Sequence, residues 1–562
     1  MNFKYIKHII PGAALVLATA GMSSCTGDLD VTPHDPSTQM NTNEPALFTK
    51  CYANMALAGQ TGPDGDCDID GLDGGTTGFV RQLFNTQELP TDEAICCWGD
   101  PGVDQFNFGT WDSSHPMING FYYRLYAGES YCNKYLQECG GQDAQHTAEV
   151  RFLRALYYYY LMDAFGNVPF TTEVSIEAPK QIKRADLFKW LEEELINEVE
   201  PNLMDASVTH EGEVGYGRAQ KDAAWLLLAR MYLNAEVYTG TARWQDAKTY
   251  AEKVIAGPHK LWTTPKNGYS AYQMLFMGDN GTNGASQEAV LSLIQDGTTT
   301  ASYGTTLFLM ASTWKSDMNF DKNYGSSEFW AGNRARSNLV KKFFPTSDAP
   351  QDSTYKVTAA AGDARALFCG CGTEVKKNDK KSEEASKLAG KEVIVNDTNY
   401  VKRTLVAEKW GEYTNGFSVA KYRNTYSDGS IPHNAKFCDT DFFLMRSAEA
   451  YFIAAEADAR LHGDVTTECA KYINDIRQRA GVSTQDRWTI NQILDERARE
   501  FYFEGYRRTD LIRYGLFNTG EYLWEWKGGT LKGVSFPATH CVFAIPANDI
   551  IANPNLKQNE GY

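Results

Sequence analysis

Residues 151–170 read RFLRALYYYYLMDAFGNVPF and predict a long helix that ends sharply. The helical pattern covers Ala148–Phe165, where apolar side chains recur at helical spacing. Gly166 ends the helix, and the Asn167–Pro169 segment keeps it from resuming because proline cannot continue it. The run Tyr157–Tyr160 covers every face of one turn, which indicates packing on all sides within a helical scaffold.

Two further segments show the same pattern and each has a partner. Lys221–Tyr238 is followed by Trp244–Ile255, and Phe443–Leu461 is followed by Cys469–Ala480. In each pair a short turn connects a long helix to a second helix, and the long helix has Ala at close-contact positions. This arrangement is typical of tetratricopeptide-like repeats. Ile493–Tyr514 is also expected to be helical. The sequence therefore predicts a mostly α fold built on a helical-repeat scaffold.

The composition changes between about residues 262 and 440. Gly, Ser, Thr and Asn become frequent, long helical periods disappear, and residues 375–392 form a charged run expected to be a solvated loop. A loop-rich insertion on a helical scaffold is where function usually lies. We expect one domain over residues 46–562, made of a scaffold at about 46–261 and 441–520, the insertion at about 262–440, and a C-terminal tail at 521–562.

The N-terminus predicts a lipid-anchored exported protein. Residues 1–25 read MNFKYIKHIIPGAALVLATAGMSSC, with a basic start, a short apolar core and small residues before Cys25. This pattern predicts a lipoprotein signal peptide over 1–24 and acylation of Cys25, for example with palmitate. An ordinary cleaved signal with an incidental cysteine is the alternative. Residues 25–45 are polar and are expected to be a tether, and no later stretch of 18 apolar residues predicts a transmembrane helix.

Charge and motifs exclude several functions. The chain has 54 Lys and Arg against 71 Asp and Glu, a net charge of −17, which disfavours nucleic acid as a partner. No zinc-like cysteine spacing, Walker loop, HExxH or GxSxG occurs among its motifs. The adjacent acids Asp92 and Glu93 are expected in a turn and helix-cap role rather than as a glycosidase pair. We expect no enzyme, no catalytic residues and no metal ligands.

Several segments together resemble the SusD/RagB family of outer-membrane nutrient-binding lipoproteins. With the lipobox-like N-terminus, the resemblance rests on residues 151–170, RAQKDAAWLLLARMYLNAEVYTG (218–240), RSAEAYFIAAEADAR (446–460), ILDERAREFYFEGYRRTDLIRYGLF (493–517) and AIPANDIIANPNLKQNEGY (544–562). The resemblance implies a SusD-like fold and a role in polysaccharide utilisation. It also implies a place on the outer face of the outer membrane and a SusC-like TonB-dependent transporter as partner.

Finer segments resemble the starch-binding branch of that family. They are TGFVRQLFNTQELPTDE (77–93), IQDGTTTASYG (294–304) and YLWEWKGGTLKG (522–533). This resemblance implies non-catalytic binding of starch or maltooligosaccharides and their delivery to the transporter. The alternatives are the same architecture with another glycan or with peptides and, less favoured, a surface glycosidase.

The resemblance also implies the binding residues, one position at a time. In the starch binder an arc of aromatic rings meets the helical curve of starch. Trp98 follows the PTDE turn, Tyr303 lies in the QDG…YG segment, and Trp330 stands fourteen residues before Phe344. Arg81, which follows the residues Gly78-Phe79-Val80, is the implied hydrogen-bond donor to the sugar.

Two departures from the family pattern affect the site. Where the starch binder has an asparagine three residues past the first tryptophan, this chain has Pro101, so Asp100 becomes the candidate for that contact. The family's calcium contacts are Asp-rich near residues 279–284, whereas DNGTNG has only Asp279. Calcium remains an open alternative, and no cofactor is expected.

The chemistry of the implied site is that of a sugar platform. Pyranose rings have apolar C–H faces and hydroxyl groups around the rim. An aromatic ring can therefore cover the face while the hydroxyl groups remain hydrated. A guanidinium offers several donors in a fixed fork to adjacent hydroxyls. Because each such hydrogen bond nets only about 0.5–1.5 kcal/mol, we expect weak binding, with Kd on the order of 10 μM to 1 mM.

Overall fold

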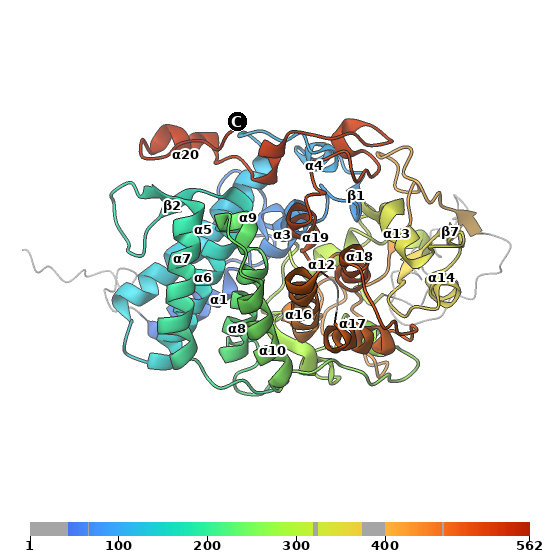
Figure 1. Cartoon of the computed structure of the whole chain (residues 1–562), viewed down its shortest axis with the longest axis horizontal. Coiled ribbons are helices and arrows are strands. Elements are labelled where there is room, and N and C mark those ends of the chain that lie inside the picture. The colour runs from blue at the N-terminus through green and yellow to red at the C-terminus, as the bar shows by residue number, and fades with distance from the viewer. Residues whose placement is uncertain (1–42, 66, 319–323, 374–399, 464–465) are drawn as a thin grey trace, which may run out of the picture. The chain divides into compact units, whose positions relative to one another are not determined.

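Long helices packed side by side form the scaffold (Figure 1). The computed structural model describes residues 43–65, 67–318, 324–373, 400–463 and 466–562. Neighbouring long helices pack as α5 (Pro116–Glu138) on α6 (Ala144–Phe165), α6 on α7 (Arg184–Glu194), α8 (Lys221–Leu233) on α10 (Trp244–Ala256), α10 on α16 (Ser447–His462), and α16 on α17 (Thr467–Arg479). This arrangement confirms the predicted mostly α class with a helical-repeat scaffold.

Helix α6 shows why the scaffold forms. Asp143 caps its N-terminus, where the carboxylate accepts the His146 N–H at 2.9 Å, and Gly166 ends it with a positive φ of 71°. All four side chains of Tyr157–Tyr160 are buried, as the four-tyrosine run predicts. Helix α6 is therefore packed on all sides and forms a central member of the scaffold.

Several predicted helices have different bounds in the structure. The helix expected over Lys221–Tyr238 is two, α8 and α9 (Ala235–Thr239), separated at Asn234. Phe443 starts no helix, because strand β10 (Phe442–Arg446) pairs antiparallel with β4 (Ala289–Leu293), and α16 begins only at Ser447. The single helix expected over 493–514 is two: α18 (Ile490–Phe501) and α19 (Arg507–Arg513). The break contains Phe503 with φ 65° and Gly505 with φ 88°, so the backbone there cannot be helical.

The remaining α-helices and strands are short. The helices are α1 (Glu44–Ala53), α2 (Gly74–Thr77), α3 (Phe79–Gln87), α4 (Val103–Phe108), α9 (Ala235–Thr239), α11 (Ala271–Met274), α12 (Thr306–Ala311), α13 (Ser337–Phe343), α14 (Thr354–Ala361) and α20 (Ala547–Ala552). The strands pair antiparallel in twos: β1 (Ala94–Cys96) with β5 (Asn333–Ala335), β2 (Val168–Phe170) with β3 (Lys180–Ile182), β6 (Phe368–Cys369) with β9 (Ser418–Val419), and β7 (Cys371–Thr373) with β8 (Tyr400–Lys402). Those of them that fall between about 262 and 440 have the irregular, short-element character expected for that region.

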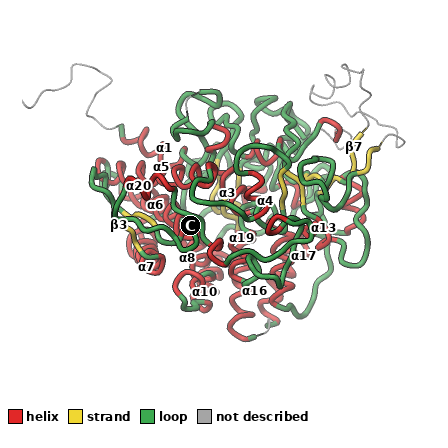
Figure 2. Tube along the Cα trace, turned by 90° about the horizontal axis from the view of Figure 1, so that it is seen from above, coloured by secondary structure: helices red, strands yellow, loops and turns green. Residues whose placement is uncertain are grey.

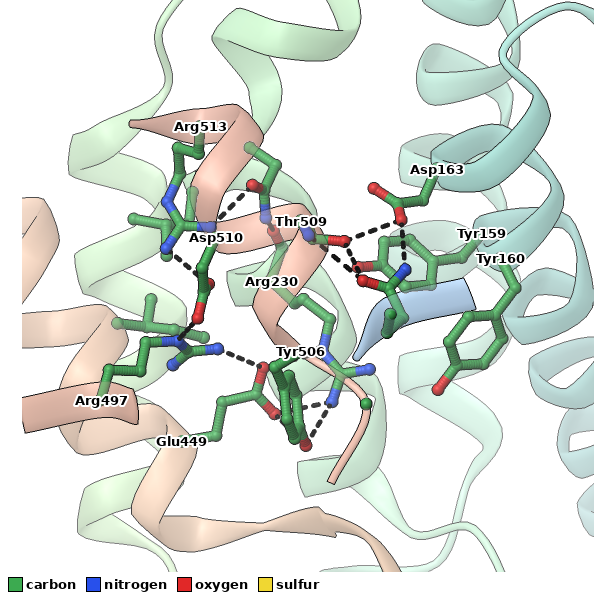
Figure 3. A pocket seen from close by; sticks show the side chains of 15 residues that line it. Tyr159, Tyr160, Asp163, Arg230, Glu449, Arg497, Tyr506, Thr509, Asp510 and Arg513 are labelled. Atoms are coloured by element: carbon green, nitrogen blue, oxygen red, sulfur yellow. Dashed lines mark hydrogen bonds and ion pairs between the residues drawn. The ribbon is translucent and has the colours of Figure 1, made fainter. Parts of the chain in front are cut away.

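Buried polar contacts join the N-terminal helices to the C-terminal ones and the C-terminal helices to each other (Figure 3). Arg230 of α8 donates to Glu449 of α16 at 2.8 and 2.6 Å, and Thr509 of α19 donates to Asp163 of α6 at 2.8 Å. Arg497 of α18 binds Asp510 at 2.7 Å. Because buried charges are tolerated only when paired, these contacts fix how the helix pairs meet.

Residues Pro45–Tyr562 form one compact unit. Figure 2 shows α10 and α16 on one side of it and many of the irregular segments on the other. None of the helices in the described part of the chain is long and apolar enough to cross a membrane. The predicted signal peptide, Cys25, most of the predicted tether and the charged run 375–392 lie outside the described residues.

Candidate functional site

The five residues expected at the site line one open hollow on the surface. The hollow has a volume of about 480 Å³, and its lining contains Arg81, Trp98, Asp100, Tyr303 and Trp330 together with Asp73, Gly75 and Gly99. The five come from three distant parts of the chain, so the fold brings together what the sequence separates. Their role in ligand binding remains a prediction.

The β1–β5 ladder positions the two tryptophans. Ile95 pairs with Arg334 and Cys96 with Asn333, and the Cys97 N–H extends the ladder to the carbonyl of Gly332 at 3.1 Å. Trp98 lies just after β1, and its indole N–H donates to the carbonyl of Trp330 at 3.1 Å. The two rings are therefore held side by side at the end of a buried ladder.

Gly332 provides the space for the Trp98 indole. A Cβ at this position would lie 2.2 Å from Cε2 of Trp98, far inside ordinary contact distance. Only a residue without a side chain lets the indole lie against this backbone.

Buried ion pairs anchor the strand that leads to Trp98. Asp92 accepts from Arg507 at 2.6 and 2.9 Å, and Asp92 and Arg507 are both buried. Arg336 also binds this segment, with its backbone N–H on the carbonyl of Glu93 at 3.0 Å. Asp92 lies in a turn, as expected, but neither acid caps a helix. Arg507, which is distant in the sequence and invisible to local patterns, makes both acids part of a buried charge network.

Arg81 and Tyr303 approach from adjoining backbone segments. Arg81 lies in the first turn of α3, and its backbone N–H donates to the carbonyl of Gly304 at 3.0 Å. Its guanidinium lies over two rings, 5.5 Å from the centre of Trp98 and 5.1 Å from that of Phe308. Phe308, which is buried, thus supports both Arg81 and Trp98 from beneath.

The three rings form an arc rather than a flat strip. The centres of Trp98 and Trp330 are 6.5 Å apart with planes inclined by 56°, and those of Trp330 and Tyr303 are 6.2 Å apart with planes inclined by 48°. All three side chains are half-buried and line the open hollow. Neighbouring ring planes are therefore strongly inclined to each other, which suits a curved ligand better than a straight one.

A polar cluster borders one end of the arc. The Arg81 guanidinium is 3.8 Å from the carboxylate of Asp100, and the Asp100 side chain is 51% exposed. At this distance the two groups do not form a close hydrogen bond, so both keep hydrogen-bonding capacity for a ligand. Burial lowers the pKa of Arg81, while the charges of Asp73 and Asp100 oppose that shift.

Asp73 belongs to the same cluster. It caps α2, where its carboxylate accepts from the Thr76 N–H at 2.9 Å and the Thr76 hydroxyl at 2.6 Å. Burial raises its pKa, but the hydrogen bonds from Thr76 and the charge of Arg81 outweigh that effect and lower it overall. Asp73 is therefore an ionised acceptor at neutral pH.

Charged residues also border the other end of the arc. The Tyr303 hydroxyl donates to Asp64 at 2.7 Å and accepts from the ammonium of Lys436. The indole N–H of Trp330 donates to Glu328 at 2.8 Å. Since the polar atoms of all three rings are bonded within the protein, the rings offer a ligand chiefly their faces.

The segment expected to carry the family's calcium contacts is closed by the protein's own donors. One carboxylate oxygen of Asp279 accepts from the N–H and hydroxyl of Ser427, and the other accepts from Asn283 at 3.2 Å. Within the described ranges no group of three or more His, Cys, Asp and Glu side chains could hold a metal ion.

Comparison with known proteins identifies the family. The model of the SusD family matches residues 267–562. Over its full length the chain is 36% identical to the starch-binding protein SusD of Bacteroides thetaiotaomicron, and the match also covers all of that protein. The chain belongs to the SusD family.

Solved structures of the SusD family share the fold. A SusD-like protein from Bacteroides fragilis matches with a TM-score of 0.64 at 18% identity, covering 92% of this chain and 96% of that one. The surface glycan-binding protein A of Bacteroides thetaiotaomicron, in complex with laminarihexaose, matches with a TM-score of 0.61 at 18% identity, covering 92% and 98%. At these identities the likeness concerns the fold alone.

Four polar residues around the arc were missed by the sequence reasoning. The Asp73-Gly-Gly-Thr pattern is a helix-cap signal that could have placed Asp73 at a helix start, but not on the hollow. Asp64, Glu328 and Lys436 lie in irregular segments, and no local pattern or SusD-family motif used above marks them.

Proposed function

We propose that this SusD-family protein binds starch and maltooligosaccharides at the cell surface without cleaving them. Five separated residues line a single open hollow, and this observation carries the proposal. The hollow offers three inclined ring faces and a polar cluster of Arg81, Asp73 and Asp100, which match the apolar faces and hydroxyl rims of glucose units.

The inclination of the rings supports a curved α-glucan as the ligand. Planes that turn by 56° and then 48° cannot all lie flat against a straight chain, whereas a helical chain presents its sugar faces in a turning sequence. The 36% identity to the starch-binding protein of Bacteroides thetaiotaomicron supports the same ligand class.

The wider role follows from family membership and the N-terminal sequence. The protein is anchored to the outer membrane through an acylated Cys25, faces the cell exterior, and passes oligosaccharides to a SusC-like TonB-dependent transporter. Weak, quickly reversible binding suits this transfer, because a tightly held ligand would be released slowly.

The second candidate is the same architecture with another glycan, and one observation favours it: a protein with the same fold forms a complex with laminarihexaose, a fragment of a β-glucan.

A glycosidase is disfavoured by the site's charges. Asp73 and Asp100 are the acids that the described chain places along the hollow, and the pKa of Asp73 is lowered. A glycosidase general acid needs a raised pKa.

Affinity electrophoresis on a panel of polysaccharides tests the proposal. We expect retardation by amylose and amylopectin and none by laminarin or cellulose. The variant Trp98→Ala should lose measurable starch binding while keeping the thermal unfolding curve of a folded protein. Retardation by laminarin alone would favour the second candidate, and release of reducing ends from starch over hours would show an enzyme.

A further inference from the structure

Two charged side chains from distant parts of the chain hold the hydroxyl of Tyr303. The hydroxyl donates to Asp64 at 2.7 Å, and the ammonium of Lys436 donates to the hydroxyl. The same ammonium lies 4.7 Å from the centre of the Tyr303 ring. Since a phenol has a single proton to donate, the bond to Asp64 leaves this hydroxyl unable to donate to a ligand.

The backbone around Lys436 is attached to the segment that carries Trp330. The Ser326 hydroxyl donates to the carbonyl of Lys436 at 2.9 Å, and the Ser327 N–H donates to the carbonyl of Ala435 at 2.7 Å. Lys436 therefore reaches the Tyr303 ring through its side chain and the Trp330 segment through its backbone.

The neighbouring groups strengthen this connection. The ring of Phe437, which is buried, lies 5.3 Å from that of Tyr303. The pKa of Lys436 is raised, first because its ammonium bonds to Tyr303 and further because the charges of Asp64 and Glu328 face it. Glu328 in turn accepts the indole N–H of Trp330. The polar atom of Tyr303 is therefore bonded to Lys436 itself, and that of Trp330 to a carboxylate that interacts with Lys436.

We propose that Lys436 is a positioning residue that sets the angle between the Tyr303 and Trp330 rings and thereby the curvature of the arc. The inference deepens the proposed function and rests on it, because curvature matters only if the arc binds a curved chain. Without the ammonium, the hydroxyl of Tyr303 keeps only the exposed Asp64, and the ring is free to leave the 48° inclination that it holds against Trp330. Selectivity for coiled glucans then falls.

A double-mutant cycle measured by calorimetry with α-cyclodextrin tests this role. Lys436→Met removes the donor and the charge but keeps the length of the side chain, and Tyr303→Phe removes the hydroxyl that Lys436 holds. We expect each variant to weaken binding about 3- to 10-fold and the double variant to bind no more weakly than the weaker single variant. Lys436→Arg should restore most of the affinity, and Lys532→Met, at an exposed lysine of the tail, should match wild type.

Two results would overturn the inference. One is wild-type affinity in Lys436→Met. The other is an equal further loss from Lys436→Met in the Tyr303→Phe background, which would mean that Lys436 acts on the sugar itself.

A crystal structure of ligand-free Lys436→Met gives a readout that does not depend on the ligand. We expect the Tyr303 ring to change its inclination to Trp330 or to become disordered, with the Trp98–Trp330 pair unchanged. A Tyr303 ring in its original place would contradict the inference. If the wild-type protein binds no α-glucan at all, the proposed function fails, and this structure still decides whether Lys436 positions the ring.

Discussion

Replacing Gly332 by alanine should disable the arc without changing any residue that faces the ligand. The new Cβ would lie 2.2 Å from Cε2 of Trp98, whereas ordinary contact begins at 3.4 Å, so the indole must move by at least 1.2 Å. Trp98 is half-buried and borders the open hollow, so it can swing outward. The cost in the free energy of unfolding is therefore at the low end of overpacking, about 1 kcal/mol.

The cost in ligand affinity should be larger. Stacking a sugar on the indole buries on the order of 100 Å² of apolar surface in total, which at ~25 cal/mol per Å² contributes about 2.5 kcal/mol. Losing most of that contribution weakens binding by between about 10- and 100-fold, since each 1.4 kcal/mol is a factor of ten. Calorimetry with maltoheptaose measures this ratio directly.

Gly99 provides the matched control. It also lines the hollow, but a Cβ there would meet no atom within 4 Å. Gly99→Ala should therefore bind within about twofold of wild type. The reasoning is refuted if Gly332→Ala binds maltoheptaose like wild type, or if both variants lose affinity equally.

Three further predictions concern the site and its support. Arg81→Lys should weaken glucan binding about 3- to 10-fold, measured by calorimetry, with little change in the free energy of unfolding, because a lysine cannot reproduce the fork of guanidinium donors. Wild-type affinity in this variant would show that the guanidinium does not bind the ligand. Arg507→Leu should lower the free energy of unfolding in denaturant by about 3–5 kcal/mol, because it leaves the buried Asp92 without its main partner; a loss below 1 kcal/mol would contradict this. Burial raises the pKa of Glu129 in α5 to about 7, against an ordinary value of 4.5. The neutral carboxyl therefore favours the fold below about pH 4.5, and this stability is lost as the pH rises through 7. Between pH 5 and 8, Glu129→Gln should gain up to about 3 kcal/mol of unfolding free energy relative to wild type, and parallel pH curves for the two proteins would contradict the assignment.

The scaffold could be predicted from the sequence because its helices are specified locally. The Ala148–Phe165 pattern and the Gly166 stop contain the signals that α6 uses in the structure, including its end at Phe165. The failures occur where distant residues decide the conformation. Phe443 has helical neighbours in the sequence, but pairing with β4 makes its segment a strand. At the break between α18 and α19, Phe503 and Gly505 have positive φ, and Gly505 lies against Leu83 from a distant part of the chain, a contact that no local pattern indicates.

The candidate site, like the fold, could be predicted from the sequence only in part. The stacking residues Trp98, Tyr303 and Trp330 were accessible through family resemblance, because rings at fixed motif positions can be carried over one by one. The residues that orient those rings were not. Lys436 acts through contacts with segments more than a hundred positions away, and Gly332 acts by the space it leaves, so neither has a signal in the sequence.

A crystal structure of the protein with maltoheptaose tests the central claim most directly. We expect one oligosaccharide lying along the hollow, with sugar faces against Trp98, Trp330 and Tyr303 and hydroxyls bonded to Arg81. A bound chain on another surface, or one that lies in the hollow without covering any of the three rings, would contradict the account.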